Sequence, residues 1–264
     1  MSDINSSTFF DSHCHFDFAE FDRDRELIWQ QCRKHNIDGL LIPGTTPEQW
    51  PGLFSLAKTY PGTVGAVGVH PWWVSRLAGE RLNSQQQQFM HECLQQPLCV
   101  ALGECGLDGL IDLPLDRQQP IFEQQLALAC EYQKPLVIHC RKAHNQLLAL
   151  LARYRPQKGG VIHGFSGAVE LARQYWRLGF SLGIGGTISY PRAAKTRRMV
   201  QAMPLDALLL ETDAPDMPLN GYQGRPNSPL KVIDVAKCLA ELRQETLNTI
   251  AQVTTGNARQ LFQL

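Results

Sequence analysis

The chain has 264 residues, of which 44% are hydrophobic and 19% charged, and its 25 basic residues balance 25 acidic residues. This composition excludes disorder as the dominant state, and a net charge of zero argues against a broad basic surface for nucleic acid. No apolar run of about 18 residues predicts a membrane helix, and the first residues lack an export pattern, so we expect a cytoplasmic protein with no membrane partner and no obligate protein partner.

Short apolar segments alternate with longer segments of helical spacing along the whole chain. We expect strands at residues 8–13, 38–43, 63–69, 98–103, 136–139, 160–163, 179–182 and 207–211. Helical spacing lies between them, for example in residues 116–133. Eight β-α units in this length predict a single α/β domain over residues 1–264, a parallel sheet closed into a TIM-like (β/α)8 barrel. A doubly wound open sheet is the alternative.

Potential metal ligands stand at the ends of five of these strands. They are His13, His15, Glu104, His139, His163 and Asp213. His13 and His15 are two residues apart and point to the same side of their strand. A lone histidine is more often structural, but the carboxyl ends of barrel strands converge on one face. The set therefore predicts a metal site at that face.

Alternation along the strands supports this assignment. We expect inward rows of Val100, Leu102 and Glu104, of Val137 and His139, and of Val161 and His163. Cys14, Cys105 and Cys140 have the opposite parity, so we expect these thiols to pack outward against helices. The eight cysteines form no C-x-x-C pair and are expected to be reduced.

Four histidines and two carboxylates exceed the needs of one tetrahedral ion. They suit two divalent ions bridged by a carboxylate and a water, with zinc, manganese or magnesium as candidates. His70 ends the third strand and is a candidate substrate-binding or supporting residue. We leave out His35, His91 and His144, which lie in predicted helices.

Seven short motifs resemble the TatD family of metal-dependent hydrolases, and within it the YjjV group. They are DSHCHFD (11–17), GVHP (68–71), GECGLD (103–108), IHCRKA (138–143), HGFSG (163–167), LETDAP (210–215) and TGNAR (255–259). The resemblance implies a TIM-like barrel with a dinuclear site. One ion would be held by His13, His15 and Asp213, the other by His139 and His163, and Glu104 would bridge them. The family's activity is deoxyribonuclease, including removal of nucleotides from a 3′ end.

The chain departs from the family pattern after residue 108, at Lys142 and at residues 225–229. We expect hydrolysis of a phosphoester, with DNA as the leading substrate, Glu104 and Asp213 as catalytic residues and Arg141 as a substrate contact. Two alternatives remain open at this stage: hydrolysis of an amide or lactone, as amidohydrolases perform, and a non-catalytic binding module stabilised by metal. The basic residues 192–198 are expected to be a solvated helix face.

Overall fold

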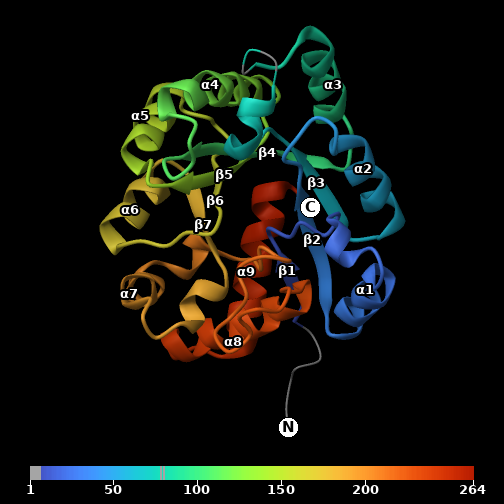
Figure 1. Cartoon of the computed structure of the whole chain (residues 1–264). Coiled ribbons are helices and arrows are strands. Elements are labelled where there is room, and N and C mark those ends of the chain that lie inside the picture. Colours follow the sequence, from blue (N-terminus) through green and yellow to red (C-terminus); the bar gives the residue numbers. More distant parts are fainter. Residues whose placement is uncertain (1–6, 78, 80) are drawn as a thin grey trace.

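The computed structural model describes residues 7–77, 79 and 81–264, so residues 1–6, 78 and 80 of the expected domain lie outside the described residues. Eight parallel strands form one sheet in chain order (Figure 1). They are β1 (Phe9–Asp11), β2 (Ile37–Pro43), β3 (Thr63–Val67), β4 (Cys99–Asp108), β5 (Leu136–Arg141), β6 (Gly160–Ile162), β7 (Phe180–Ile184) and β8 (Leu208–Leu210). All eight expected strands are confirmed, with shifted ends.

Backbone hydrogen bonds between the ends of β1 and β8 close the sheet. The N–H of Ser12 donates to the carbonyl of Leu210 at 2.9 Å, and the N–H of Asp213 donates to the carbonyl of His13 at 2.9 Å. The fold is therefore the expected TIM-like barrel, and the open-sheet alternative is wrong. Closure also brings the segments that follow the first and last strands side by side.

Helices surround the barrel (Figure 1). They are α1 (Arg25–Lys34), α2 (Trp50–Thr59), α3 (Ser84–Leu94), α4 (Leu115–Glu131), α5 (His144–Tyr154), α6 (Val169–Arg177), α7 (Ala194–Ala202), α8 (Val232–Arg243) and α9 (Leu247–Phe262). The α3 helix begins at a capping box, in which the side chains of Asn83 and Gln86 each accept the other's backbone N–H. No helix among the described residues has the length and apolar character that a membrane span requires.

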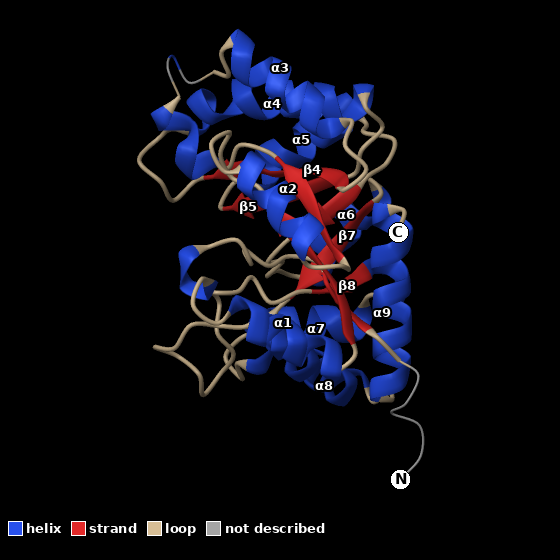
Figure 2. Cartoon of the chain, turned by 90° about the vertical axis from the view of Figure 1, so that its right-hand side faces the viewer, coloured by secondary structure: helices blue, strands red, loops and turns tan. Residues whose placement is uncertain are grey.

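The barrel interior is filled by aliphatic side chains and two phenylalanines. They are Phe10, Leu41, Val64, Ala66, Val100, Ala101, Val137, Val161 and Leu209, joined by Ala258 and Phe262 of α9. Figure 2 shows α9 at the side of the barrel away from the long loops. The ring centroids of Phe10 and Phe262 are 6.2 Å apart, so α9 seals that end of the interior and leaves the carboxyl ends of the strands for the site.

Two irregularities in β4 change the expected alternation. Gly65 pairs with Cys99 but Ala66 pairs with Ala101, and a second shift lies between Leu102 and Cys105. An extra residue in a strand reverses the faces of the residues that follow it. Leu102 therefore packs in the outer layer, and the prediction that it points inward with Val100 is wrong.

The strand is also longer than expected. β4 continues to Asp108, so Glu104 lies within it rather than after it. The thiols behave as predicted, because Cys14 and Cys105 are buried in the outer layer and Cys140 packs against it.

Candidate metal centre

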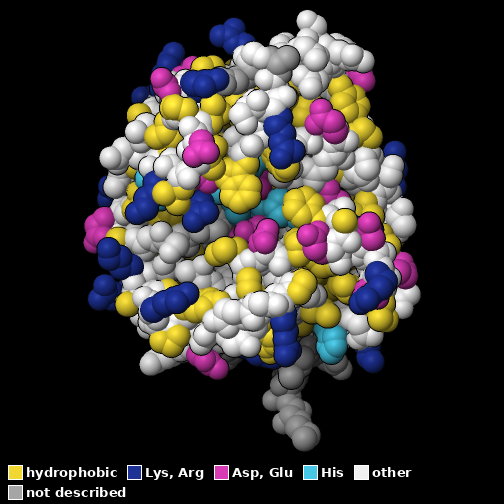
Figure 3. Space-filling view, in the orientation of Figure 1, with side chains coloured by type: hydrophobic (Ala, Val, Ile, Leu, Met, Phe, Trp, Pro, Cys, Tyr) yellow, Lys and Arg dark blue, Asp and Glu magenta, His cyan; other side chains and the backbone are white. Residues whose placement is uncertain are grey.

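The expected ligands converge at the carboxyl ends of the strands. Figure 3 shows histidine side chains at the centre of the face that Figure 1 presents, between acidic and hydrophobic groups. His13, His15, His70, Glu104, His139 and His163 are all buried, and 17% of the Asp213 side chain is exposed. The convergence brings together seven ionisable side chains that lie up to 200 residues apart in the sequence.

Glu104 lies between two groups of these residues. Its Oε2 is 3.3 Å from Nε2 of His13 and 3.6 Å from Nε2 of His15. Its Oε1 is 2.9 Å from Nε2 of His163 and 3.3 Å from Nδ1 of His139. Each carboxylate oxygen thus faces its own set of imidazoles, which is the arrangement that a carboxylate bridging two cations requires.

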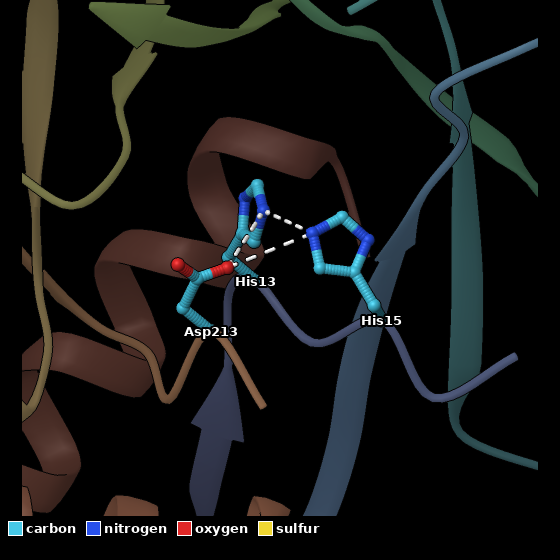
Figure 4. Close-up of side chains that lie close together, drawn as sticks. All are labelled: His13, His15 and Asp213. Carbon is cyan, nitrogen blue, oxygen red and sulfur yellow. Dashed lines mark hydrogen bonds and ion pairs between the residues drawn. The ribbon is translucent and has the colours of Figure 1, made fainter. Parts of the chain in front are cut away.

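The first group contains His13, His15 and Asp213 (Figure 4). The two Nε2 atoms are 3.3 Å apart and lie 3.5 and 3.6 Å from Oδ1 of Asp213. Their three ligand atoms lie within 4.8 Å of one another. The hydrogen bond between the backbones of Asp213 and His13 fixes this group, because it joins the segments that follow β8 and β1.

The second group contains His139, which lies within β5, and His163, which directly follows β6. Nδ1 of His139 is 3.3 Å from Nε2 of His163, while Nε2 of His139 lies 3.0 Å from Oδ2 of Asp108. A carboxylate that accepts the second ring N–H of a ligand histidine fixes its tautomer and orientation. His139 therefore directs the lone pair of Nδ1 toward Glu104 and His163.

Asp108 was missing from the predicted site. Its Oδ2 also accepts a hydrogen bond from Nε1 of Trp72 at 2.9 Å, and its Oδ1 accepts one from the N–H of Leu110 at 2.9 Å. The GECGLD motif contained the signal, but only the extension of β4 to residue 108 shows that the carboxylate reaches His139.

His70 differs from His139 in the ring nitrogen that it turns toward Glu104. Its Nδ1 accepts the backbone N–H of Trp72 at 3.1 Å, so in the neutral ring the proton is on Nε2. Nε2 lies 3.3 Å from Oε1 of Glu104 and has no free lone pair for a cation. The hydrogen bonding therefore argues for His70 as a donor at the edge of the second group rather than as a ligand, although its distance alone would permit ligation.

Two buried carboxylates brace the ligands from below. Asp11 accepts hydrogen bonds from the N–H and the hydroxyl of Thr212 and from the N–H of His13, and so ties together the segments carrying His13 and Asp213. Oε1 of Glu211 accepts the N–H of Gly164, next to His163. A Cβ at Gly183 would lie 2.0 Å from Oε2 of Glu211, so only glycine leaves room for this carboxylate.

The remaining candidates lie outside the cluster. Arg141 is exposed at the end of β5, and its carbonyl accepts the N–H of Gly109. Arg197 donates to the carbonyl of Ile188, which is a structural contact. His91 and His144 hydrogen-bond to tyrosine hydroxyls away from the site, and His35 follows α1 directly rather than lying within it.

The electrostatics of the cluster suit cation binding. Burial lowers the pKa of His13 to about 4 and that of His15 to about 3, so both rings are neutral at pH 7, as metal ligands must be. Burial opposes ionisation of Glu104, but the surrounding histidines, His163 first, outweigh it and hold its pKa well below the usual range. Burial raises the pKa of Asp213 to about 8. Burial opposes protonation of His139 and His163, but the hydrogen bond of His139 to Asp108 and the charge of Glu104 beside His163 outweigh it and raise the pKa of both rings. The first group therefore offers neutral imidazoles at pH 7, whereas a cation in the second group would displace protons from its rings.

Comparisons with known proteins point to one family. Residues 10–263 match the family described as TatD related DNase. The chain is 41% identical over 255 residues to an uncharacterized metal-dependent hydrolase, YjjV, of Escherichia coli K12, covering 96% of this chain and 97% of the relative. It is 35% identical over 254 residues to a 3′-5′ ssDNA/RNA exonuclease TatD of a Rahnella species, covering 93% and 95%.

A solved structure agrees with the sequence comparisons. The crystal structure of YjjV, a TatD homologue from Escherichia coli, superimposes with a TM-score of 0.91 at 39% identity, covering 97% of this chain and 98% of that one. Both the fold and the length of the chain are therefore shared with this relative.

Proposed function

Because this chain belongs to the TatD related DNase family of metal-dependent hydrolases, we propose that it hydrolyses phosphodiester bonds in DNA, including release of nucleotides from a 3′ end. The single observation that carries the proposal is the position of Glu104. Its two oxygens face two separate sets of histidines, as a bridge between two cations would. A pair of cations suits phosphodiester cleavage, since both the attacking and the leaving oxygen need charge stabilisation.

The residues divide into two proposed ligand sets within one hydrolase domain. His13, His15 and Asp213 would hold one divalent ion, His139 and His163 would hold the other, and Glu104 would contact both. When bound, such ions lower the pKa of a coordinated water and stabilise charge on the phosphoryl oxygens. Zinc suits the imidazole nitrogens of these sets, manganese and magnesium suit their carboxylate oxygens, and we propose one of these three as the metal.

The protein's own side chains would then handle the proton and the substrate. Oδ1 of Asp213 faces the two histidines, which leaves Oδ2 to orient the attacking water and accept its proton. The Nε2 proton of His70 would donate a hydrogen bond to a phosphoryl oxygen next to Glu104. Arg141, at the exposed end of β5, would contact a phosphate further along the strand.

A nuclease assay with metal-loaded protein tests this proposal. The protein is loaded with manganese, zinc or magnesium and given single-stranded and duplex DNA labelled at the 5′ end. We expect stepwise shortening from the 3′ end, abolished by chelation and reduced at least a hundredfold in Glu104→Gln. Glu123→Gln, which changes an acid on α4, serves as the matched control and should retain activity.

Three results would overturn the proposal. Equal hydrolysis by Glu104→Gln would place the activity in another site or another protein. Faster turnover of cyclic amides or lactones than of either DNA would support the amidohydrolase alternative, and a loaded protein that hydrolyses neither class would favour the binding module.

A further inference from the structure

Trp72 is exposed and yet held in place. It lies in the short 3-10 helix Pro71–Arg76, which follows β3, and 52% of the residue is accessible to solvent. Its backbone N–H donates to Nδ1 of His70 at 3.1 Å, and its indole Nε1 donates to Oδ2 of Asp108 at 2.9 Å. Trp72 has two hydrogen-bond donors, the backbone N–H and the indole N–H. Both are therefore bonded to residues of the candidate metal centre.

The indole borders the second ligand group. Its ring lies edge-on to the ring of His70, with centroids 5.2 Å apart and an interplanar angle of 90°. The ring of His139 is 6.5 Å away at 71°. In Figure 3, hydrophobic side chains adjoin the visible histidine atoms at the centre of this face. One edge of the indole thus contacts the site, while half of the residue faces solvent.

This combination requires an explanation. A large aromatic surface left in water gives up the stabilisation that burial would provide. The indole N–H is already bonded, so the exposed part offers no further hydrogen bond and can recognise a ligand only by apolar contact and stacking. A rigid ring of this kind loses little side-chain entropy when a planar ligand covers it.

We propose that the indole of Trp72 is a stacking platform for a nucleobase of a single-stranded nucleic acid, next to the ester that Glu104 and its histidines would act on. This inference rests on the proposed phosphodiesterase function. It adds that the nucleobase, and not only the phosphate, contributes binding energy. Bases stack on exposed aromatic side chains with little dependence on sequence. Bases inside a duplex are already stacked on each other, so the platform favours single strands and unpaired 3′ ends.

Phe18 is the aromatic residue beside the first ligand group. Its ring stacks on His15 with centroids 4.6 Å apart at 23°, and it is partly buried. Phe18 therefore supports a ligand of the first group, whereas Trp72 remains available at the second group. The two sides differ, and the base would lie on the His139 side.

Binding of two single-stranded oligonucleotides, measured separately, tests the platform. The first carries normal bases throughout, and the second is identical except for abasic residues at its three 3′-terminal positions. Dissociation constants are measured by fluorescence anisotropy in the Glu104→Gln background, so that the strand stays intact. We expect the protein to bind the normal strand about tenfold more tightly than the abasic strand, which corresponds to about 1.4 kcal/mol, and Trp72→Leu to bring that ratio close to one.

Two further variants separate stacking from support of the metal centre. Trp72→Phe retains an aromatic ring but loses the hydrogen bond to Asp108, and it should retain most of the preference for the normal strand. Trp176→Leu removes another exposed tryptophan, 37% accessible near the end of α6, and should leave the ratio unchanged.

Three outcomes overturn the inference: equal binding of the two strands by the parent protein, equal weakening of both strands by Trp72→Leu, or tighter binding of a duplex than of a single strand. The binding assay does not depend on turnover. Failure of DNA hydrolysis would therefore count against the proposed function, whereas loss of base dependence would count against the platform.

Discussion

Asp108→Asn is the sharpest test of how the second ligand group is held. The carboxylate accepts three N–H groups: Oδ2 binds those of His139 and Trp72, and Oδ1 binds that of Leu110. Asparagine has the same shape but only one accepting oxygen. In one orientation its NH2 group faces the N–H of Leu110, and in the other it faces both ring N–H groups. At least one donor is left unbonded in either case.

The magnitude follows from the type of bond that is lost. Burial opposes ionisation of Asp108, but hydrogen bonds from His139 and Trp72 outweigh it and hold its pKa below the usual range. A hydrogen bond to a charged group contributes about 1.5–3 kcal/mol. Loss of a carboxylate behind a ligand histidine typically weakens metal binding about 10- to 100-fold, which is about 1.4–2.8 kcal/mol. The two estimates agree.

The assay is metal affinity measured by competition with a chelating indicator. We expect Asp108→Asn to weaken one of two sites and to leave the site of His13, His15 and Asp213 near its original affinity. Asp112→Asn changes an exposed acid in the loop that follows β4; it is the matched control and should bind both ions normally. Melting curves of the metal-stripped proteins check the fold. Identical affinities for Asp108→Asn and Asp112→Asn would refute the argument that Asp108 orients His139.

Three further predictions concern substrate binding, the barrel interior and proton release. Arg141→Ala should raise KM for an oligonucleotide and leave metal content intact, and unchanged kinetics would remove Arg141 from the substrate site. Leu41→Ala empties part of the barrel interior and should lower the free energy of unfolding by about 2–5 kcal/mol in urea titrations, whereas a loss below 1 kcal/mol would contradict its assigned place. Because burial raises the pKa of Asp213 to about 8, metal must displace a proton below that pH. Affinity should therefore rise from pH 6 to pH 8, and calorimetry in buffers of different ionisation enthalpy should detect more released protons for the parent protein than for Asp213→Asn; equal release would contradict a protonated Asp213.

The sequence was sufficient to predict the barrel and the convergence of the candidate ligands, and the reason is physical. Parallel strands buried on both faces appear as short apolar runs, and a histidine or carboxylate just after such a run has only one place to go in a barrel. His13, Glu104, His139 and Asp213 could be assembled in this way. The metal count and the cytoplasmic location stay predictions.

Other features of the site depend on three-dimensional geometry that the inward and outward alternation of residues along a strand does not predict. The extra residues in β4 turn Leu102 outward and yet leave Glu104 pointing inward. The tautomer of His70 is set by the backbone N–H of Trp72, and the role of Asp108 by how far β4 extends. A hydrogen bond between residues 31 positions apart, such as that of Asp108 and His139, leaves no periodic trace in the sequence.

The position of α9 has a consequence for how the protein is made. Its Phe262 fills the interior beside Phe10, and the hydroxyl of Thr255 donates to the carbonyl of Thr8 across 247 residues of chain. A ribosome translates every candidate ligand by residue 213, before it reaches α9, which seals the barrel. The emerging chain therefore carries all the candidate ligands before it can complete the core beneath them. A chain that stopped before α9 would still encode every candidate ligand but would lack the contact of Phe262 with Phe10 in the barrel interior.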